Sequence, residues 1–244
     1  MGRDHWCYGL LDSRANRFTH IRYVELGERE EVENLAPLFE MLPANPAKVI
    51  VCSAYPGALV APQQYFKDDF ALLKTVEGLP SQSYLSDRIT EWQMVTTYSI
   101  PETMYNQLLA RYPHTRFFHI YTPSIRVYNG SVAEQQIDLH FSTRQFRVLV
   151  RKNSTLQLVQ TYEYRIPLDV VYYLLKICEE LQLDQSKLFL VISGLVDKDS
   201  ALYAELYNYF LNIQFAPAPG ISVPDHGHPH YYFTSLYNLA TCGS

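Results

Sequence analysis

The chain has 244 residues, of which 48% are hydrophobic and 18% charged, and its formal net charge is −5 at pH 7. This length fits one large domain or two small lobes, and the balanced composition excludes extended disorder and a fibrous architecture. The acidic balance argues against a nucleic-acid binder with a broad basic face, because Lys and Arg supply most of that affinity. Tyrosine is in excess, with 20 residues against 12 Phe and 2 Trp. This amphipathic residue favours surfaces that contact a partner.

No segment approaches the roughly 18 consecutive apolar residues of a transmembrane helix, and the N-terminal segment lacks the pattern of an export signal. We therefore expect a cytoplasmic protein without membrane insertion. The four cysteines are scattered and form no C-x-x-C pair, which fits reduced thiols better than a disulfide framework.

The first half begins with a hairpin, in which 6–11 and 17–25 are strand-like and 12–16 is the turn. An amphipathic helix is predicted over 28–42. Its acidic residues lie in the first turn, near the positive end of the helix, and Pro43 stops it.

A short apolar run, 48–53, predicts a buried strand. Proline and glycine interrupt the next segment, 55–87, which we interpret as loop, helix and loop. In that helix Phe66, Phe70 and Leu73 would share one face.

Farther along, 91–99 is a strand candidate, Pro101 opens a helix, and 116–121 is a strand. Proline is well placed at the start of a helix, because its missing N–H has no helical partner there.

The second half has a clearer pattern. Three strand-like runs, 136–141, 145–150 and 156–162, are separated by short polar turns and predict an antiparallel meander. A strong amphipathic helix over 167–183 follows, and 187–192 is a second buried strand.

A further helix is expected over 201–211 and a short strand over 212–215. A Pro-rich linker, 216–220, leads to a tail in which 231–239 can form a last helix. The two halves share an order of antiparallel strands, helix, buried strand and helix, which predicts two α/β lobes facing each other across a cleft.

The runs 169–184, 188–194 and 206–210 resemble an uncharacterised bacterial domain-of-unknown-function family. That family is similar to a divergent branch of the actin-like ATPase fold, the duplicated ribonuclease-H-like architecture also used by sugar kinases, chaperone ATPases and the pilus-assembly protein PilM. The resemblance implies an α/β fold of two ribonuclease-H-like lobes with mixed sheets flanked by helices. We place the lobes at 1–118 and 119–244, with a C-terminal tail that can pack back on the first lobe.

Active members of this fold bind ATP and Mg²⁺ between the lobes, through loops that pair an Asp with a nearby glycine. Glycine is needed because backbone N–H groups wrap a phosphate only where no Cβ intrudes. Here no glycine follows the first hairpin's Asp, and bulky His140 and Phe141 stand where the second loop needs glycine. The vestigial phosphate-loop candidates are Asp12, Asp138, Ser142, Thr143 and Gly194.

The densest group of metal-capable side chains is His226, His228 and His230. Three imidazoles could hold zinc or nickel. However, metal ligands usually come from separate rigid elements, and these follow a Pro/Gly linker, so we favour a lightly packed segment.

Other catalytic patterns are missing from the sequence. It contains no nucleophile elbow, no P-loop and no dinucleotide fingerprint. A basic group on the meander, Arg144, Arg147, Arg151 and Lys152, is interpreted as a solvated strand face, with a small anion or RNA contact as the alternative.

The leading hypothesis is a catalytically degenerate pseudo-ATPase that acts as a scaffold or adaptor for an unidentified protein partner, with no catalytic residue and no cofactor. The alternative is a weak ATP-dependent or kinase-like enzyme that binds Mg-nucleotide in the inter-lobe cleft through Asp138 and Asp12. A third hypothesis is a metal-dependent hydrolase built on the three histidines.

Overall fold

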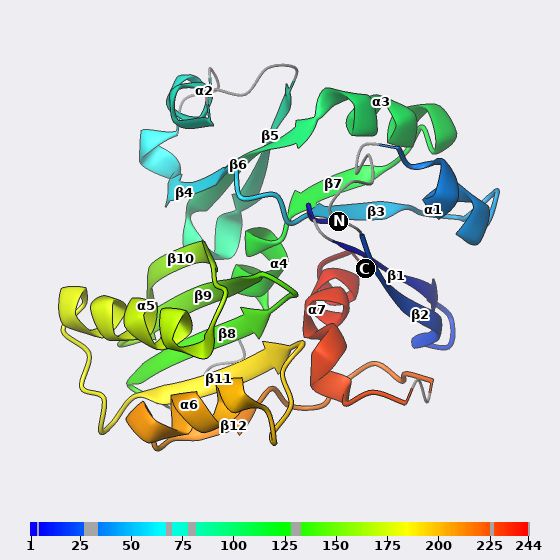
Figure 1. Ribbon diagram of the computed structural model, residues 1–244. Coiled ribbons are helices and arrows are strands. Elements are labelled where there is room, and N and C mark those ends of the chain that lie inside the picture. Colours follow the sequence, from blue (N-terminus) through cyan, green and yellow to red (C-terminus); the bar gives the residue numbers. More distant parts are fainter. Residues whose placement is uncertain are drawn as a thin grey trace. The chain divides into compact units, whose positions relative to one another are not determined.

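The computed structural model describes residues 1–3, 5–26, 34–66, 70–77, 82–127, 133–224 and 227–243. The chain divides into two compact units, and neither of them is a single continuous stretch of sequence (Figure 1). Unit 1 consists of Met1–Tyr8, Arg22–Arg126 and the residues from Thr241 onward, and unit 2 of Gly9–Ile21 and Val127–Ala240.

The first part of the chain contains three small sheets. Its elements are β1 (His5–Asp12), β2 (Arg17–Glu25), α1 (Ala36–Met41), β3 (Ile50–Ser53), β4 (Ala58–Pro62), the 3-10 turn η1 (Gln63–Tyr65), α2 (Ala71–Glu77), β5 (Gln82–Ile89), the 3-10 turn η2 (Thr90–Trp92), β6 (Met94–Pro101), α3 (Glu102–Arg111), β7 (Arg116–His119) and α4 (Tyr121–Arg126). Strand β1 pairs with β2, β3 runs parallel to β7, and β4, β6 and β5 form an antiparallel sheet in that order.

The predicted hairpin, the strand β3 and the helix α3 are confirmed. The helix predicted within 55–87 is present as α2, but the loops predicted on either side of it are wrong, because β4 and β5 lie there as the two outer strands of a sheet. The strand β4 is a short apolar run, ALVAP, that ends in proline, whereas β5, QSYLSDRI, is mostly polar, and the side chains of both strands are mostly half-buried. Phe66 and Phe70 precede α2 and meet edge to face instead of sharing its surface, while Leu73 is buried within the helix.

Other boundaries in the first part of the chain also differ from prediction. The strand expected over 91–99 is β6, which begins only at Met94 because η2 precedes it. The strand expected over 116–121 ends at His119, and α4 begins at Tyr121 with Pro123 in its first turn, where a proline is tolerated. The helix expected over 28–42 begins only at Ala36, and its predicted acidic first turn lies outside the described residues.

Unit 1 has its own hydrophobic core. Side chains from the hairpin, α1, β3, β6 and α3 form it: Trp6, Leu26, Leu35, Leu38, Val51, Tyr98, Ile100, Met104 and Leu108. The other tryptophan, Trp92, also lies in this unit, in η2.

The second part of the chain forms a five-stranded mixed sheet. Its elements are β8 (Gln135–Phe141), β9 (Gln145–Lys152), β10 (Thr155–Glu163), α5 (Pro167–Glu180), β11 (Phe189–Gly194), α6 (Ala201–Tyr209), β12 (Ile213–Phe215), the 3-10 turn η3 (His230–Phe233) and α7 (Thr234–Gly243). The strand order is β10-β9-β8-β11-β12. Strands β8, β9 and β10 form the predicted antiparallel meander, whereas β11 runs parallel to both β8 and β12. This arrangement is the one expected of a ribonuclease-H-like lobe.

Helices α5 and α6 pack on one face of this sheet (Figure 1). The alternating residues Ile137, Leu139 and Phe141 of β8 point into the core that the helices cover. On the opposite face, the Arg147 guanidinium of β9 donates a hydrogen bond to Ser235 Oγ at the start of α7, at 3.0 Å.

The N-terminus of α5 is capped by a carboxylate. Pro167 occupies the first turn, and the Asp169 carboxylate accepts hydrogen bonds from the N–H groups of Arg165 and Ile166, at 2.8 and 3.1 Å. These bonds satisfy donors that a helix N-terminus leaves without partners. The Asp169 carboxylate is therefore occupied by the fold.

A row of stacked aromatic rings attaches the C-terminal tail to unit 2. Tyr203 of α6 stacks on Phe215 of β12, and Phe215 stacks on Tyr231 of η3, with ring centroids 5.6 and 4.1 Å apart. The hairpin contributes Phe18, which is buried against Tyr237 and whose N–H donates to Ser222 O at 2.9 Å. None of the described helices has the length and apolar character needed to span a membrane.

Candidate functional site

Four of the phosphate-loop candidates lie on or beside the carboxyl-terminal parts of β8 and β11: Asp138, Ser142, Thr143 and Gly194. Ligands bind near the carboxyl ends of the strands in open α/β sheets. Asp138 sits on the face of β8 that points away from the α5 and α6 core, and it is partly exposed. Its carboxylate forms an ion pair with the Arg151 guanidinium of β9 and accepts a hydrogen bond from Gln136 Nε2 at 2.7 Å. The carboxylate charge is therefore compensated from within the same sheet.

Gly194 ends β11 with a φ of +83°, a conformation that residues with a Cβ rarely adopt. A Cβ placed on it would lie 2.0 Å from the carbonyl oxygen of Phe141. The contact arises because Gly194 is directly opposite Phe141 in the parallel pairing of β11 with β8. Backbone packing alone thus requires glycine here.

The two hydroxyl residues after Phe141 form the turn between β8 and β9. Ser142 Oγ donates a hydrogen bond to Gln145 O at 3.1 Å, and the Ser142 N–H donates to the same oxygen at 2.8 Å. Thr143 is the next residue of the turn and is half-buried. The Ser142 hydroxyl is therefore used to close its own hairpin.

His140 and Ser193 form a side-chain pair beside these residues. Their Nδ1 and Oγ atoms are 3.0 Å apart, and Ser193 Oγ donates to Leu139 O at 3.0 Å. Because the hydroxyl hydrogen points to that carbonyl, Ser193 accepts from His140 Nδ1–H. The serine hydroxyl is thus not oriented as a nucleophile whose proton the imidazole would remove.

Asp12 is the last residue of β1, directly before the turn to β2, and belongs to unit 2. Its Oδ1 accepts hydrogen bonds from the N–H groups of Arg14 and Ala15, at 3.0 and 3.1 Å. This geometry is an Asx turn, in which the side chain stabilises the backbone reversal.

The basic group on the meander is largely occupied within unit 2. The Lys152 ammonium donates to Leu181 O and Gln182 O at the end of α5, both at 3.0 Å, and caps its last carbonyls. Arg151 pairs with Asp138, and Arg147 donates to Ser235. The interpretation of this group as a solvated face is therefore wrong for three of its four members.

The histidine group is used for packing where it is described. His228 stacks on Tyr232, with ring centroids 5.5 Å apart, and His230 Nε2 is 2.9 Å from Ala216 O. His226 lies outside the described residues. No group of three or more metal-capable side chains is arranged to hold an ion in the part of the chain that the structure describes.

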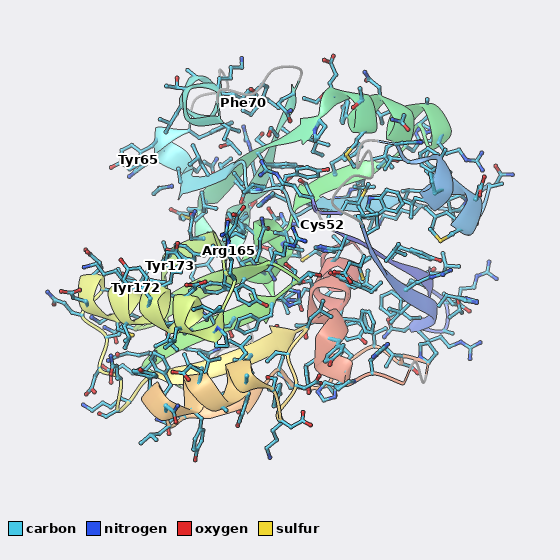
Figure 2. The ribbon with its side chains drawn as sticks, in the orientation of Figure 1. Cys52, Tyr65, Phe70, Arg165, Tyr172 and Tyr173 are labelled. Carbon is cyan, nitrogen blue, oxygen red and sulfur yellow. The ribbon has the colours of Figure 1, made fainter. Side chains whose placement is uncertain are left out.

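None of the four cysteines forms a disulfide, as expected. Burial raises the pKa of the Cys7 and Cys178 thiols to about 11. Cys52 is buried in β3 (Figure 2). The two thiols with raised pKa values are protonated at neutral pH, which makes them poor nucleophiles.

Sequence reasoning missed a buried polar cluster in unit 1, centred on Asp87 of β5. Asp87 is only 7% exposed, and its carboxylate accepts three hydrogen bonds. Tyr98 Oη donates to Oδ1 at 3.1 Å, whereas the His119 N–H and Thr122 Oγ1 donate to Oδ2 at 2.8 and 2.6 Å. One carboxylate thus links the three-stranded sheet to β7 and α4.

Desolvation raises the pKa of Asp87 to about 6, and the three hydrogen bonds only partly oppose this effect. Thr96 lies directly opposite Asp87 in β6 and is fully buried, and its hydroxyl has no hydrogen-bond partner among the described residues. The sequence of β5, QSYLSDRI, is mostly polar and gives only a weak strand signal. The burial of Asp87 could therefore not be predicted from the sequence.

The described exposed surface shows where the tyrosine excess reaches solvent. Six of its nine large exposed hydrophobic residues lie on or beside α5 and α6, namely Ile166, Leu168, Tyr172, Tyr207, Tyr209 and Leu211. Tyr173 and Tyr203 of the same helices are half-buried instead and take part in aromatic stacks. Exposed tyrosine is thus concentrated on the helical face of unit 2.

A family described as "Protein of unknown function (DUF3822)" matches residues 8–213, which is most of the chain. A search of curated proteins found no match to the sequence.

Solved structures share the fold. A Bacteroides thetaiotaomicron protein with an actin-like ATPase fold and unknown function matches with a TM-score of 0.80 and 17% identity, over 97% of this chain and 92% of that one. A chain from a PilM–PilN type IV pilus biogenesis complex matches with a TM-score of 0.62 and 10% identity, over 100% of this chain and 96% of that one. At these identities the likeness concerns the fold alone, which is the actin-like ATPase fold.

Proposed function

The chain belongs to the DUF3822 family of unknown function and has an actin-like ATPase fold, and from this premise we propose that it is a scaffold or adaptor that works without nucleotide and binds a protein partner. The observation that carries the proposal is the engagement of the phosphate-loop candidates within the fold. The carboxylate expected to hold a metal ion, that of Asp138, is paired with Arg151.

The other candidates support the same proposal. A phosphate cradle needs backbone N–H groups that point outward from a loop without Cβ obstruction. Gly194 is instead packed against the backbone of Phe141, and the Ser142 hydroxyl and N–H both bond to Gln145 O. Asp12 holds its own turn. A nucleotide would have to displace several of these interactions before it could bind.

Partner binding is supported by the surface of unit 2. Clustered exposed apolar side chains often mark a protein–protein interaction site, whereas single ones are common on any surface. A chain of similar fold occurs in a protein–protein assembly, the PilM–PilN type IV pilus biogenesis complex, and this likeness supports the proposal of a protein partner. The side chains at the end of α6, Tyr207, Tyr209 and Leu211, are 52%, 41% and 72% exposed and are suitable anchors.

The nucleotide part is tested by thermal shift and isothermal titration with Mg-ATP. We expect no saturable stabilisation by Mg-ATP. A ligand that binds the folded protein would add about 2.7 kcal/mol to the free energy of unfolding at about 100 times its Kd. Stabilisation of that size that is lost in Asp138→Asn but kept in the control Asp199→Asn would instead support the weak ATP-dependent enzyme.

The partner part is tested by affinity capture from an extract of the source cells. We expect a specific protein to be retained by the wild type and lost with Leu211→Ser or Tyr207→Ala. Tyr65→Ala is the matched control, because Tyr65 is 71% exposed but lies in unit 1. Equal retention by all variants, with unchanged circular dichroism, would contradict the assignment of the partner surface to α6.

A further inference from the structure

Strand β10 is an edge strand of the unit 2 sheet, since the described strand order begins with it. Edge strands are normally protected from pairing by lysine, proline or a bulge. The nine residues of β10 include one charged residue, Glu163 at its end, and neither lysine nor proline. A bulge lies between Leu156 and Leu158. The regular segment from Leu158 to Glu163 therefore has little protection.

The hydrogen-bond pattern shows which backbone groups of β10 point outward. The Tyr164 N–H donates to Arg144 O at 3.0 Å, just beyond the paired residues Glu163 and Gln145. Hydrogen-bonded and non-hydrogen-bonded pairs alternate along an antiparallel ladder. Because Tyr164 and Arg144 form a hydrogen-bonded pair, Val159, an odd number of residues away, forms a non-hydrogen-bonded pair with Leu149. Its N–H and C=O point away from β9, toward the open edge.

An apolar patch borders this edge. We define the α5 patch as Ile166, Leu168 and Tyr172, which are 53%, 52% and 63% exposed. Leu168 and Tyr172 are one helical turn apart and share a face.

The patch reaches the strand through two tyrosines. Tyr172 lies against Tyr173 on α5 (Figure 2), and Tyr173 stacks on Tyr162 of β10, with ring centroids 5.5 and 4.4 Å apart. The edge and the α5 patch thus form one continuous surface within unit 2.

We propose that this surface joins two copies of the chain, with β10 pairing antiparallel to β10 of the second copy about a two-fold axis. Such an isologous contact requires a self-complementary surface. When the Leu158–Glu163 segments of the two copies pair antiparallel, Glu163 of each copy lies opposite an uncharged residue of the other. Parallel pairing in register would instead place the two Glu163 carboxylates side by side, which is unfavourable. The charge distribution therefore favours the two-fold arrangement.

The charges next to the patch are compensated in each copy. Asp169 is used by the N-terminus of α5, and the Lys176 ammonium is 2.9 Å from a Glu179 carboxylate oxygen. Covering the patch would therefore leave neither of these charges without a partner, which is the main cost of burying charged groups.

The α5 patch alone is smaller than a standard interface between two proteins. The three patch side chains are each more than half exposed, but three residues form only a small part of an interface. A standard interface buries about 800 Å² on each partner, so the strand edge and its flanks must supply the remainder. Because an interface smaller than the standard size is typical of weak association, we expect a dimer with a Kd in the micromolar range.

Sedimentation velocity of the full chain from about 1 to about 200 μM tests the proposal. Gln160→Lys adds a charge to the exposed side of β10, and Gln214→Lys is the same change on the opposite edge strand, β12. Tyr172→Glu alters the α5 patch, and Tyr207→Glu is the matched change on α6. All four side chains are exposed, so circular dichroism should remain that of the wild type.

We expect the wild type to dimerise with increasing concentration. Gln160→Lys and Tyr172→Glu should weaken dimerisation at least about tenfold, and the two control variants should change it less than about twofold. A wild-type chain that stays monomeric over the whole range overturns the proposal, as does a dimer that Tyr207→Glu or Gln214→Lys weakens as much. The measurement contains no nucleotide and no other protein, so its outcome is independent of the proposed function.

Discussion

Replacing Asp87 with asparagine should make the protein more stable at neutral pH, although it removes a carboxylate that accepts three hydrogen bonds. Asparagine resembles the protonated acid. Its carbonyl oxygen can accept from the His119 N–H and from Thr122, while its amide donates to Tyr98 Oη. The Tyr98 hydroxyl hydrogen then loses its acceptor, as it does when wild-type Asp87 is protonated.

The magnitude follows from the pKa of Asp87, which burial raises from 3.8 to about 6. At about 1.4 kcal/mol for each pKa unit, the charged form is disfavoured in the folded protein by about 3 kcal/mol. Between these two pH values the folded state binds more protons than the unfolded state, so the free energy of unfolding falls as pH rises. The stabilising contribution of Asp87 is complete below pH 3.8 and is lost as pH passes through about 6.

Urea denaturation at several pH values measures this effect. Tryptophan fluorescence is the suitable signal, because Trp6 and Trp92 both lie in unit 1 with Asp87. Asp87→Asn should match the wild type near pH 4 and exceed its free energy of unfolding by up to about 3 kcal/mol at pH 8. Glu91→Gln, which changes a carboxylate that is 55% exposed, is the control and should show no such pH dependence.

The reasoning would be refuted if Asp87→Asn were less stable than the wild type at pH 8. That result would mean that the hydrogen bonds to the charged carboxylate outweigh the cost of its desolvation. Asp87→Ala separates the two effects, because it leaves three buried donors without an acceptor. It should therefore be destabilised by about 3 kcal/mol or more at both pH values.

Three further substitutions test other parts of the fold. Gly194→Ala should lower the free energy of unfolding by more than about 3 kcal/mol, because strain at positive φ adds to the clash with Phe141; a loss below about 1 kcal/mol in urea denaturation would contradict the packing explanation. Thr96→Val should stabilise unit 1 by about 1 kcal/mol, since it removes a buried hydroxyl that has no hydrogen-bond partner in the described part of the chain, and an unchanged or lower urea midpoint would argue against this. Phe215→Ala interrupts the stack from Tyr203 to Tyr231 and should speed limited proteolysis of the tail, with Tyr209→Ala as a control that leaves the cleavage rate unchanged.

The sequence predicted unit 2 well because its elements have strong and uniform patterns. Strands β8 and β9 alternate buried and less buried residues, and α5 has an apolar stripe bounded by Pro167 and a polar end. Local periodicity is sufficient where each element buries one face against the same core. The meander followed from the short polar turns between its strands, whereas the parallel pairing of β11 with β8 and β12 was not predicted.

Unit 1 was predicted less well because its three-stranded sheet depends on tertiary context. The strand β5 has the sequence QSYLSDRI, in which the buried Asp87 stands where a pattern based on hydrophobicity expects a solvent-facing residue. A buried carboxylate is stable there only because His119 and Thr122, distant in sequence, donate to it. The pairing of Asp138 with Arg151 was missed for the same reason, since it depends on the register between β8 and β9.

The division of the chain between the units affects how the protein folds as it is synthesised. Residues 9–21 belong to unit 2 but leave the ribosome before nearly all of unit 1. The partners of Phe18, which are Ser222 and Tyr237, are made more than 200 residues later. Domains usually fold as units when their sequence has emerged, and here unit 2 cannot be completed until residues 127–240 have also emerged. The apolar side chain of Phe18 must therefore stay uncovered while the intervening residues are synthesised, and apolar surface that is exposed in this way promotes aggregation.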